Sequence, residues 1–211
     1  MTRSAVLFCL MLGAAMPAAA QVTGPVPAPP PTVEAPAGTE GNVAAPALQS
    51  ERARRLDELF SRLREADGPR QARVLEMQIA LTLAQSGSDT ADLLMVRATQ
   101  AAQQQQQDLA LSLLDSVIDL YPDYIEAWSR RATLYFARRE LGRAVSDIEQ
   151  VLRLEPRHFT AMVGLGMIFQ QLGEDRPALT AFKRALEINP HVERIPEIIR
   201  RLTPKVDGLE L

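Results

Sequence analysis

The fold of this chain is decided by residues 125–158, which read IEAWSRRATLYFARRELGRAVSDIEQVLRLEPRH. Two residue types in this stretch recur at one constant interval on both sides of it. They are the prolines Pro122, Pro156 and Pro190 and the alanines Ala110, Ala144 and Ala178. Because two unrelated residue types keep one period in phase, we expect a stack of repeated units, each too small to bury its own apolar face.

Aligned on the prolines, the repetitive region divides into units 91–124, 125–158 and 159–192. In the middle unit, large and small side chains stand at fixed spacings: Trp128, Ala132, Tyr135, Ala144, Ile148, Val151 and Pro156. The third unit has Leu165, Gly166, Phe169, Ala178, Phe182, Ala185 and Pro190 there, and the first has Leu94, Ala98, Ala101, Ala110, Leu114, Val117 and Pro122. The pattern resembles the tetratricopeptide repeat (TPR) family, in particular its small exported bacterial members. That resemblance implies an all-α solenoid of helix–turn–helix units.

The small residues of the pattern explain how each hairpin packs. Ala98, Ala132 and Gly166 on the first helices are expected to face the recurring alanines on the second helices. Small side chains on both partners let two antiparallel helices approach closely. Each recurring proline is expected to end a second helix, because proline lacks the N–H and restricts the preceding residue.

Two arginines interrupt the apolar pattern. Arg97 and Arg131 stand one repeat apart, at a position where the family usually has leucine. A buried arginine needs an acidic partner, because an unpaired buried charge is costly. One interpretation is that both side chains reach the surface and bury only their stems. The other is an internal ladder of ion pairs with acids on the second helices, namely Asp115, Asp119, Asp147 and Glu149.

The segments flanking the repeats are expected to cap the stack. In residues 50–90, an amphipathic stripe predicts a helical hairpin that covers the open face of the first unit; it consists of Leu56, Leu59, Phe60 and Leu63. In residues 193–211, Ile195, Ile198, Ile199 and Leu202 predict a short closing helix that ends before Pro204, followed by a tail. Such caps shield the terminal apolar faces of a repeat stack.

Residues 1–20 are expected to be a signal peptide. Arg3 precedes an apolar run that is too short for a bilayer, and small residues then allow cleavage near Ala20-Gln21. An uncleaved anchor is the alternative. We expect no transmembrane segment in the mature chain and export to a bacterial periplasm. Cys9 is the one cysteine, so the mature chain would need no disulfide.

Residues 21–49 are rich in proline and alanine and predict a disordered linker. Such a composition cannot bury enough apolar surface to offset the entropy of ordering. A spacer is one interpretation of this segment, and a ligand for a proline-recognising domain is the other.

The composition argues against several function classes. Without Arg3, the chain carries 22 basic and 26 acidic residues and shows no basic stripe, which argues against binding to nucleic acid. We find no metal-ligand spacing, no phosphate-binding loop and no nucleophile motif, so we expect no cofactor, no metal and no enzymatic activity.

What remains is a binding surface. The resemblance to TPR arrays implies that the first helix of each unit lines a concave groove for a peptide. By position, the groove residues would be Met95, Thr99, Ala102, Ser129, Thr133, Phe136, Val163, Met167 and Gln170. This lining is small and apolar, and it lacks the basic residues with which some family members grip a C-terminal carboxylate. It favours a hydrophobic or helical peptide, and the sequence does not decide between an extended and a helical ligand.

The sequence therefore predicts a periplasmic adaptor that binds a peptide or a partner protein of unknown identity on its concave face. A role in envelope assembly or maturation would fit that compartment. The alternative is a structural or self-associating repeat protein without an open groove, whose groove residues pack against its own segments.

Overall fold

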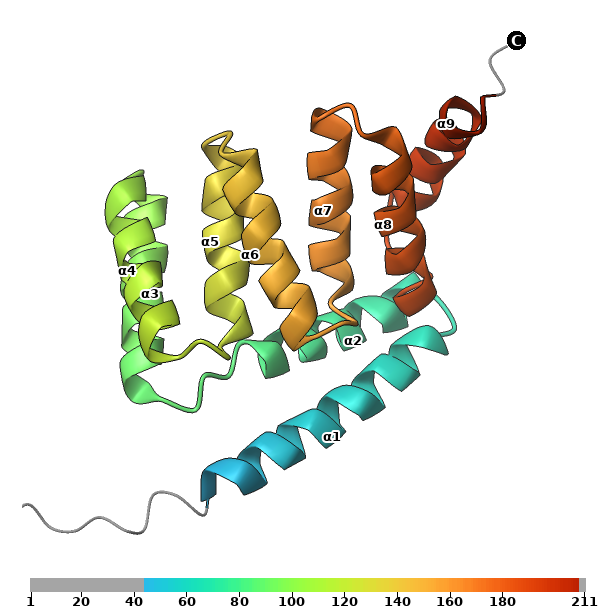
Figure 1. The fold of residues 1–211 in the computed structure, drawn as a ribbon. Coiled ribbons are helices and arrows are strands. Elements are labelled where there is room, and N and C mark those ends of the chain that lie inside the picture. The colour runs from blue at the N-terminus through green and yellow to red at the C-terminus, as the bar shows by residue number, and fades with distance from the viewer. Residues whose placement is uncertain (1–43, 209–211) are drawn as a thin grey trace, which may run out of the picture. The chain divides into compact units, whose positions relative to one another are not determined.

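The computed structural model describes residues 44–208, and every regular element in that part of the chain is a helix (Figure 1). The helices are α1 (Ala44–Arg64), α2 (Pro69–Leu83), α3 (Asp89–Gln103), α4 (Gln107–Leu120), α5 (Ile125–Ala137), α6 (Leu141–Leu154), α7 (Phe159–Gln171), α8 (Asp175–Ile188) and α9 (Ile195–Asp207). The predicted all-α repeat fold is confirmed. The predicted signal peptide, most of the predicted linker and the end of the predicted tail lie outside the described residues.

The three repeat units are the helix pairs α3–α4, α5–α6 and α7–α8, which stand side by side (Figure 1). The small positions lie where each pair meets. Ala110, Ala144 and Ala178 are fully buried, and Ala98 and Ala132 are 2% and 4% exposed. At Gly166 the approach is so close that an added Cβ would stand 2.6 Å from Cε1 of Phe182. The constant interval in the sequence therefore reflects the contacts between the two helices of each repeat unit.

The turn inside each unit also repeats. One residue of each turn adopts a left-handed backbone, with φ of 60° at Gln105, 62° at Arg139 and 76° at Gly173. These three residues occupy the same position in successive units. Only the third unit uses glycine, the residue that adopts this conformation without steric cost.

The N-terminal hairpin α1–α2 does not stack on the first unit, so the expectation that it covers that unit's open face is corrected. It runs across the ends of the repeat helices (Figure 1). One hydrogen bond joins it to the last residues of each repeat unit. Tyr124 donates its hydroxyl hydrogen to the carbonyl of Ala84, at 2.7 Å. Arg157 reaches Asp57 at 2.7 Å, and the ring of His191 bonds the carbonyl of Ala66 at 2.8 Å.

The hairpin shares its core with the repeats. Leu59 and Leu63 of α1 are fully buried and belong to one apolar cluster with Ile148 and Val151 of α6. The guanidinium of Arg157 also lies 4.5 Å from the centroid of the Phe60 ring. The hairpin and the second unit therefore share one apolar core. We call the hairpin α1–α2 the brace.

Two predicted boundaries change. Helix α1 begins at Ala44, inside the segment 21–49 that was expected to be a linker. Proline is tolerated in a first helical turn and alanine is the best helix former, so Pro46 and the alanines beside it allow this earlier start. At the other end, α9 closes the stack with buried Ile195 and Leu202, but it continues through Pro204 to Asp207.

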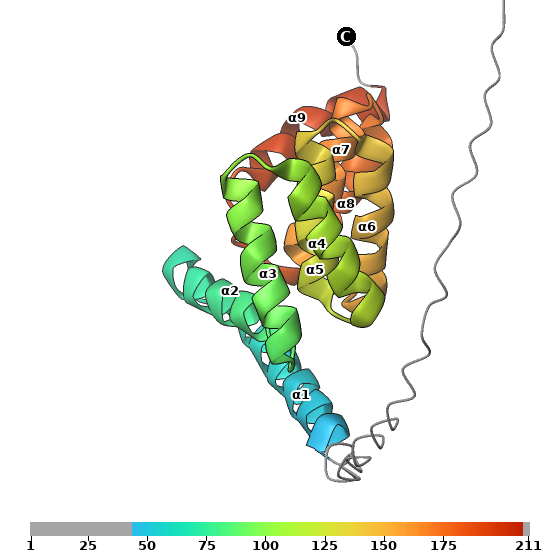
Figure 2. The ribbon, with the colours of Figure 1, turned by 90° about the vertical axis from the view of Figure 1, so that its left-hand side faces the viewer.

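Among the described residues, the first unit forms one end of the stack without a capping helix. On α5 and α7, Ala127 and Ala161 face the preceding unit and are 0% and 9% exposed, whereas Leu93 at the same position of α3 is 54% exposed. The residues that continue this stripe of α3 are exposed as well: Val96, Arg97 and Gln100. Figure 2 shows α3 and α4 nearest the viewer, with no helix in front of them. The outer face of the first unit therefore carries both apolar and polar side chains.

Candidate functional site

A pocket of about 250 Å³ lies between the first helices of units two and three, α5 and α7. Its lining consists of Ser129, Ala132, Thr133, Phe136, Ile148, Val151, His158, Thr160, Ala161, Gly164, Met167 and Ile168. The two walls come from α5 and α7, and α6 supplies the floor through Ile148 and Val151. We call this the α5–α7 pocket. It is mostly apolar and contains no charged side chain.

A second pocket of about 440 Å³ lies between α2 and the start of α5 and α7. Its lining consists of Phe60, Arg73, Glu76, Met77, Ile79, Ala80, Leu83, Glu126, Ser129, His158, Phe159 and Thr160. We call this the α2 pocket. Because Ser129, His158 and Thr160 line both pockets, the two adjoin, and we refer to them together as the groove.

Four of the nine predicted groove residues line the α5–α7 pocket, namely Ser129, Thr133, Phe136 and Met167. The predicted residues of the first unit line neither pocket. Met95 is 6% exposed and belongs to the core, and Thr99 donates to the carbonyl of Met95 at 2.8 Å. The remaining three, Ala102, Val163 and Gln170, are partly buried and also lie outside both linings.

Prediction from sequence missed the contribution of α2 and of the residues that begin α7. His158 directly precedes α7 and Gly164 lies inside it. The position of His158 after a repeat proline is visible in the sequence, but it does not by itself predict a groove residue. The α2 wall was missed because the hairpin was expected elsewhere.

Each charged residue at the groove has a partner within the chain, in an ion pair for Arg73 and Glu126 and in a hydrogen bond for Glu76. Arg73 bonds Glu193, and Glu76 accepts a hydrogen bond from Asn189. Glu126 pairs with Arg130 at 2.8 Å, and Arg130 also donates to Thr99 at 2.9 Å. The groove therefore offers a ligand apolar surface and neutral polar groups, together with one carboxylate, Glu76, that bonds a neutral amide.

Two neutral polar groups stand where the pockets adjoin. The Oγ atom of Ser129 is buried and has no hydrogen-bond partner. His158 begins α7, where its Nδ1 accepts from the backbone N–H of Ala161 at 3.2 Å and lies 3.0 Å from Oγ1 of Thr160. Burial lowers the pKa of His158 below its ordinary value, while the nearby charge of Glu155 opposes the shift. Burial therefore favours the neutral form of the ring.

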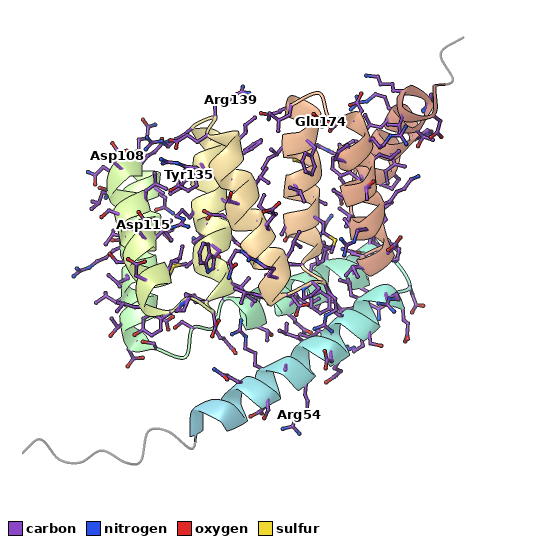
Figure 3. All side chains as sticks on the ribbon, viewed as in Figure 1. Arg54, Asp108, Asp115, Tyr135, Arg139 and Glu174 are labelled. Atoms are coloured by element: carbon purple, nitrogen blue, oxygen red, sulfur yellow. The ribbon has the colours of Figure 1, made fainter. Side chains whose placement is uncertain are left out.

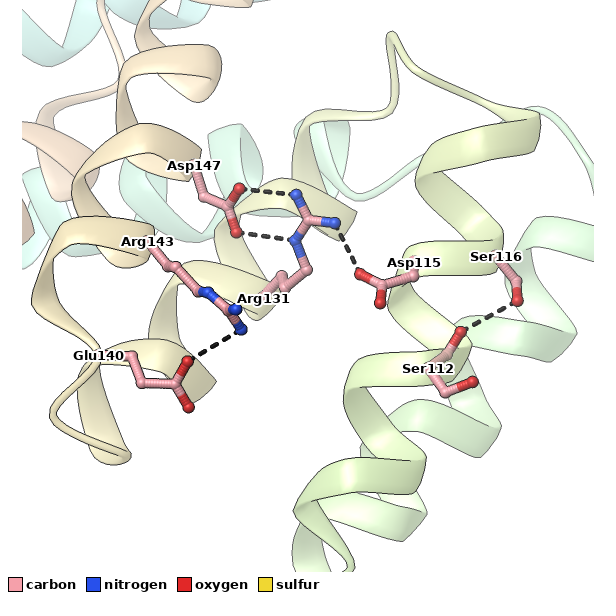
Figure 4. A network of polar contacts seen from close by, with 7 residues as sticks. All are labelled: Ser112, Asp115, Ser116, Arg131, Glu140, Arg143 and Asp147. Atoms are coloured by element: carbon pink, nitrogen blue, oxygen red, sulfur yellow. Dashed lines mark hydrogen bonds and ion pairs between the residues drawn. The ribbon is translucent and has the colours of Figure 1, made fainter.

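The ladder expected for the two arginines exists at one of them (Figure 4). Arg131 makes two hydrogen bonds to the buried carboxylate of Asp147, at 2.9 and 2.7 Å, and one to Asp115 at 2.7 Å. Its guanidinium lies 4.8 Å from the Trp128 ring centroid. The hydrogen bonds to Asp147 raise the pKa of Arg131 above its ordinary value.

This network ties units one and two together. Asp115 belongs to α4 and Tyr135, whose ring also contacts Arg131, belongs to α5 (Figure 3). Arg97 instead is exposed, and no ion pair reaches it within residues 44–208. The network therefore stabilises stacking and lies outside the groove.

The described residues contain neither a metal site nor a membrane span. No three side chains of His, Cys, Asp or Glu gather there as a metal site would need. Within the same residues, every helix is too short or too polar to cross a bilayer.

The comparisons with known proteins agree with this architecture. A profile described as tetratricopeptide repeat matches residues 129–193, and another with the same description matches residues 93–124. The chain is also similar to a TPR repeat-containing protein of Rhizobium etli, with 41% identity over 154 residues, which are 73% of this chain and 76% of the relative.

Two solved structures share the fold. The first TPR of Spaghetti (RPAP3), bound to the HSP90 peptide SRMEEVD, has a TM-score of 0.53 and 21% identity and covers 57% of this chain and 95% of its own. The Yersinia enterocolitica type III secretion chaperone SycD, in complex with a peptide of the translocator YopD, has a TM-score of 0.53 and 14% identity and covers 56% and 96%. At these identities, the likeness concerns the fold alone.

Proposed function

The chain belongs to the tetratricopeptide repeat family, and from that premise we propose that it is an exported adaptor that binds a partner protein through the groove. The observation that carries the proposal is the open, mostly apolar α5–α7 pocket of about 250 Å³. Specific recognition sites are typically concave, apolar and fitted with a few placed polar groups, and this pocket has that composition.

The solved neighbours support an interaction role. Both hold a peptide, one from HSP90 and one from YopD. Family members of this kind are interaction modules, and the α5–α7 pocket of this chain has a mostly apolar lining without a charged side chain. We propose that binding is its activity.

Export rests on the sequence of residues 1–20. An adaptor with a cleaved leader and a proline-rich spacer would act in the bacterial periplasm, and envelope assembly or maturation is the role we propose there. The segment before α1 would then separate the repeats from the leader's cleavage site near Gln21.

The test is capture of the partner from cells. A C-terminally tagged full-length chain would be expressed in its own cells and purified from an envelope extract, with mass spectrometry of the bound proteins. The double variant Phe136→Ala, Met167→Ala removes two pocket side chains. The matched control, Leu93→Ala, Leu172→Ala, removes two apolar side chains that are 54% and 51% exposed and line neither pocket.

We expect the native chain and the control to capture the same partner and the folded pocket variant to lose it. Recovery of only the chain itself from all three would contradict the adaptor and favour a self-associating protein. The same samples report export, because mass spectrometry of the purified chain should find an N-terminus near Gln21. An N-terminus at Met1 would contradict cleavage.

A further inference from the structure

We propose that the groove selects an extended, uncharged peptide segment that places one large apolar side chain in the α5–α7 pocket. This inference rests on the proposed function and specifies the chemistry of its ligand. Three observations carry it: the space in the pocket, the partners of the charged residues around the groove, and the two neutral polar groups where the pockets adjoin.

The pocket has room for one large side chain. An apolar cavity of about 150 Å³ in another protein is enough to bind benzene. The α5–α7 pocket measures about 250 Å³, so a phenyl or isobutyl group fits with space for its connecting atoms. Gly164 keeps that space open, because a Cβ there would meet only Cδ1 of Ile148, at 3.6 Å. Phe136 and Met167 would close around the inserted group.

The charges disfavour a charged ligand. Of the charged residues of the α2 pocket, Arg73 and Glu126 are in ion pairs, and Glu76 accepts a hydrogen bond from the neutral amide of Asn189. A carboxylate that entered the groove would lose hydration and find no free cationic side chain, and an ammonium group would meet only a carboxylate that already bonds Asn189. Met77 and Ala80 continue the apolar surface along α2. A neutral segment matches this surface.

The polar groups favour an extended segment over a helix. Because Nδ1 of His158 accepts from Ala161, the neutral ring carries its proton on Nε2, which becomes a donor that no described residue occupies. The hydroxyl of Ser129, a residue that lines both pockets, is the second group without a partner. A helix already bonds its own backbone groups, whereas an extended chain leaves its carbonyls open to these two donors.

The ligand test uses defined peptides and fluorescence anisotropy on the full chain. The reference is a labelled peptide of serine, threonine and valine with blocked ends and one central phenylalanine. Its matched partners replace the phenylalanine with alanine, or the serines with glutamate. We expect the alanine peptide to bind at least about tenfold more weakly, the loss expected when a phenyl group is no longer buried. The glutamate peptide and SRMEEVD should not bind measurably.

Ser129→Ala is the most specific variant, because it should lower the affinity for the peptide without lowering the melting temperature of the chain. Its hydroxyl has no partner in the free protein, so its removal should leave the melting temperature unchanged or higher. Affinity for the phenylalanine peptide should nevertheless fall about five- to tenfold, which is one neutral hydrogen bond. Gly164→Leu should fill the pocket and erase the preference for phenylalanine over alanine.

A matched pair on α2 tests the second wall. Met77 lines the α2 pocket and Val74 lines neither pocket, although the two are 58% and 50% exposed on the same helix. Met77→Glu should weaken binding of the phenylalanine peptide, and Val74→Glu should leave it unchanged. Because both side chains are exposed, neither change should unfold the chain.

Several results would overturn this ligand chemistry. Equal binding of the phenylalanine, alanine and glutamate peptides would do so, as would tighter binding of a helix-forming peptide with the same apolar residues. If partner capture still depended on Phe136 and Met167, the adaptor itself would stand. If capture were also independent of those two residues, the proposed function would fail as well.

Discussion

Units one and two carry the same sequence positions with opposite outcomes. Ala127 on α5 is fully buried, and its counterpart Leu93 on α3 is 54% exposed. Arg131 joins two helices through Asp147 and Asp115, whereas its counterpart Arg97 lies exposed. For the alanine the difference is the neighbouring unit, since unit two has a unit stacked before it and unit one does not. For the arginine it is also a partner within the unit, because Asp147 lies in unit two and its counterpart in unit one is Leu113. A repeat position therefore fixes where a residue lies in its unit. The residues that it contacts there decide how much it contributes to stability.

The largest effect should separate the two arginines. Arg131→Met would leave the carboxylate of Asp147, whose side chain is 5% exposed, without its partner. Loss of one partner of a buried ion pair costs about 3–5 kcal/mol of unfolding free energy. Arg97→Met should change stability by less than about 0.5 kcal/mol, as is usual for a surface substitution. Urea unfolding measures both. Equal stability of the two variants would contradict the difference between Arg131 and Arg97.

An added Asp147→Asn in the Arg131→Met background provides the control. It removes the stranded charge, so part of the lost stability should return. No recovery would mean that Arg131 acts through its contact with Trp128 rather than through the ion pair.

The second prediction applies the same reasoning within α7. Gly166→Ala places a Cβ 2.6 Å from the fully buried ring of Phe182, and such overpacking costs about 1–3 kcal/mol. Gly164→Ala meets no atom closer than 3.6 Å and should gain up to about 1 kcal/mol from the better helix propensity of alanine. Thermal unfolding of the two variants decides the matter. A loss at both positions would show that the groove side of α7 is packed as tightly as the repeat interface.

The smallest effect concerns His158 and pH. Its pKa is lowered by burial, so the folded state binds fewer protons than the unfolded state once the pH falls below about 6.5, the ordinary value. Stability should therefore decline as the pH falls through that value, and the decline should end below the folded pKa. His158→Asn keeps an acceptor for the N–H of Ala161 but does not titrate.

Unfolding followed between about pH 7 and pH 5, above the main titration of the carboxylates, should show a flatter profile for His158→Asn than for the native chain. Identical profiles would show that protonation of His158 does not change the stability of the folded chain.

The same contrast explains what the sequence could predict. Slots such as Ala144 and Gly166 face a helix of their own unit, so their pattern repeats and predicts the fold. The brace α1–α2 is held by single contacts between distant residues, for example Arg157 with Asp57. Such a pair has no period and leaves no pattern in one sequence. The wall that α2 adds to the groove could not be predicted for the same reason. The predicted residues of unit one do not line the groove, and Met95 among them is buried in the core.

The most direct measurement is site-specific photo-crosslinking in living cells. A photoreactive amino acid would replace Met167, which lines the α5–α7 pocket, or Leu172, which lines neither pocket. The two native side chains are 42% and 51% exposed, so accessibility alone does not separate them. We expect a cross-link from position 167 to another protein and none from position 172. A cross-link from position 172 alone would contradict binding in the groove.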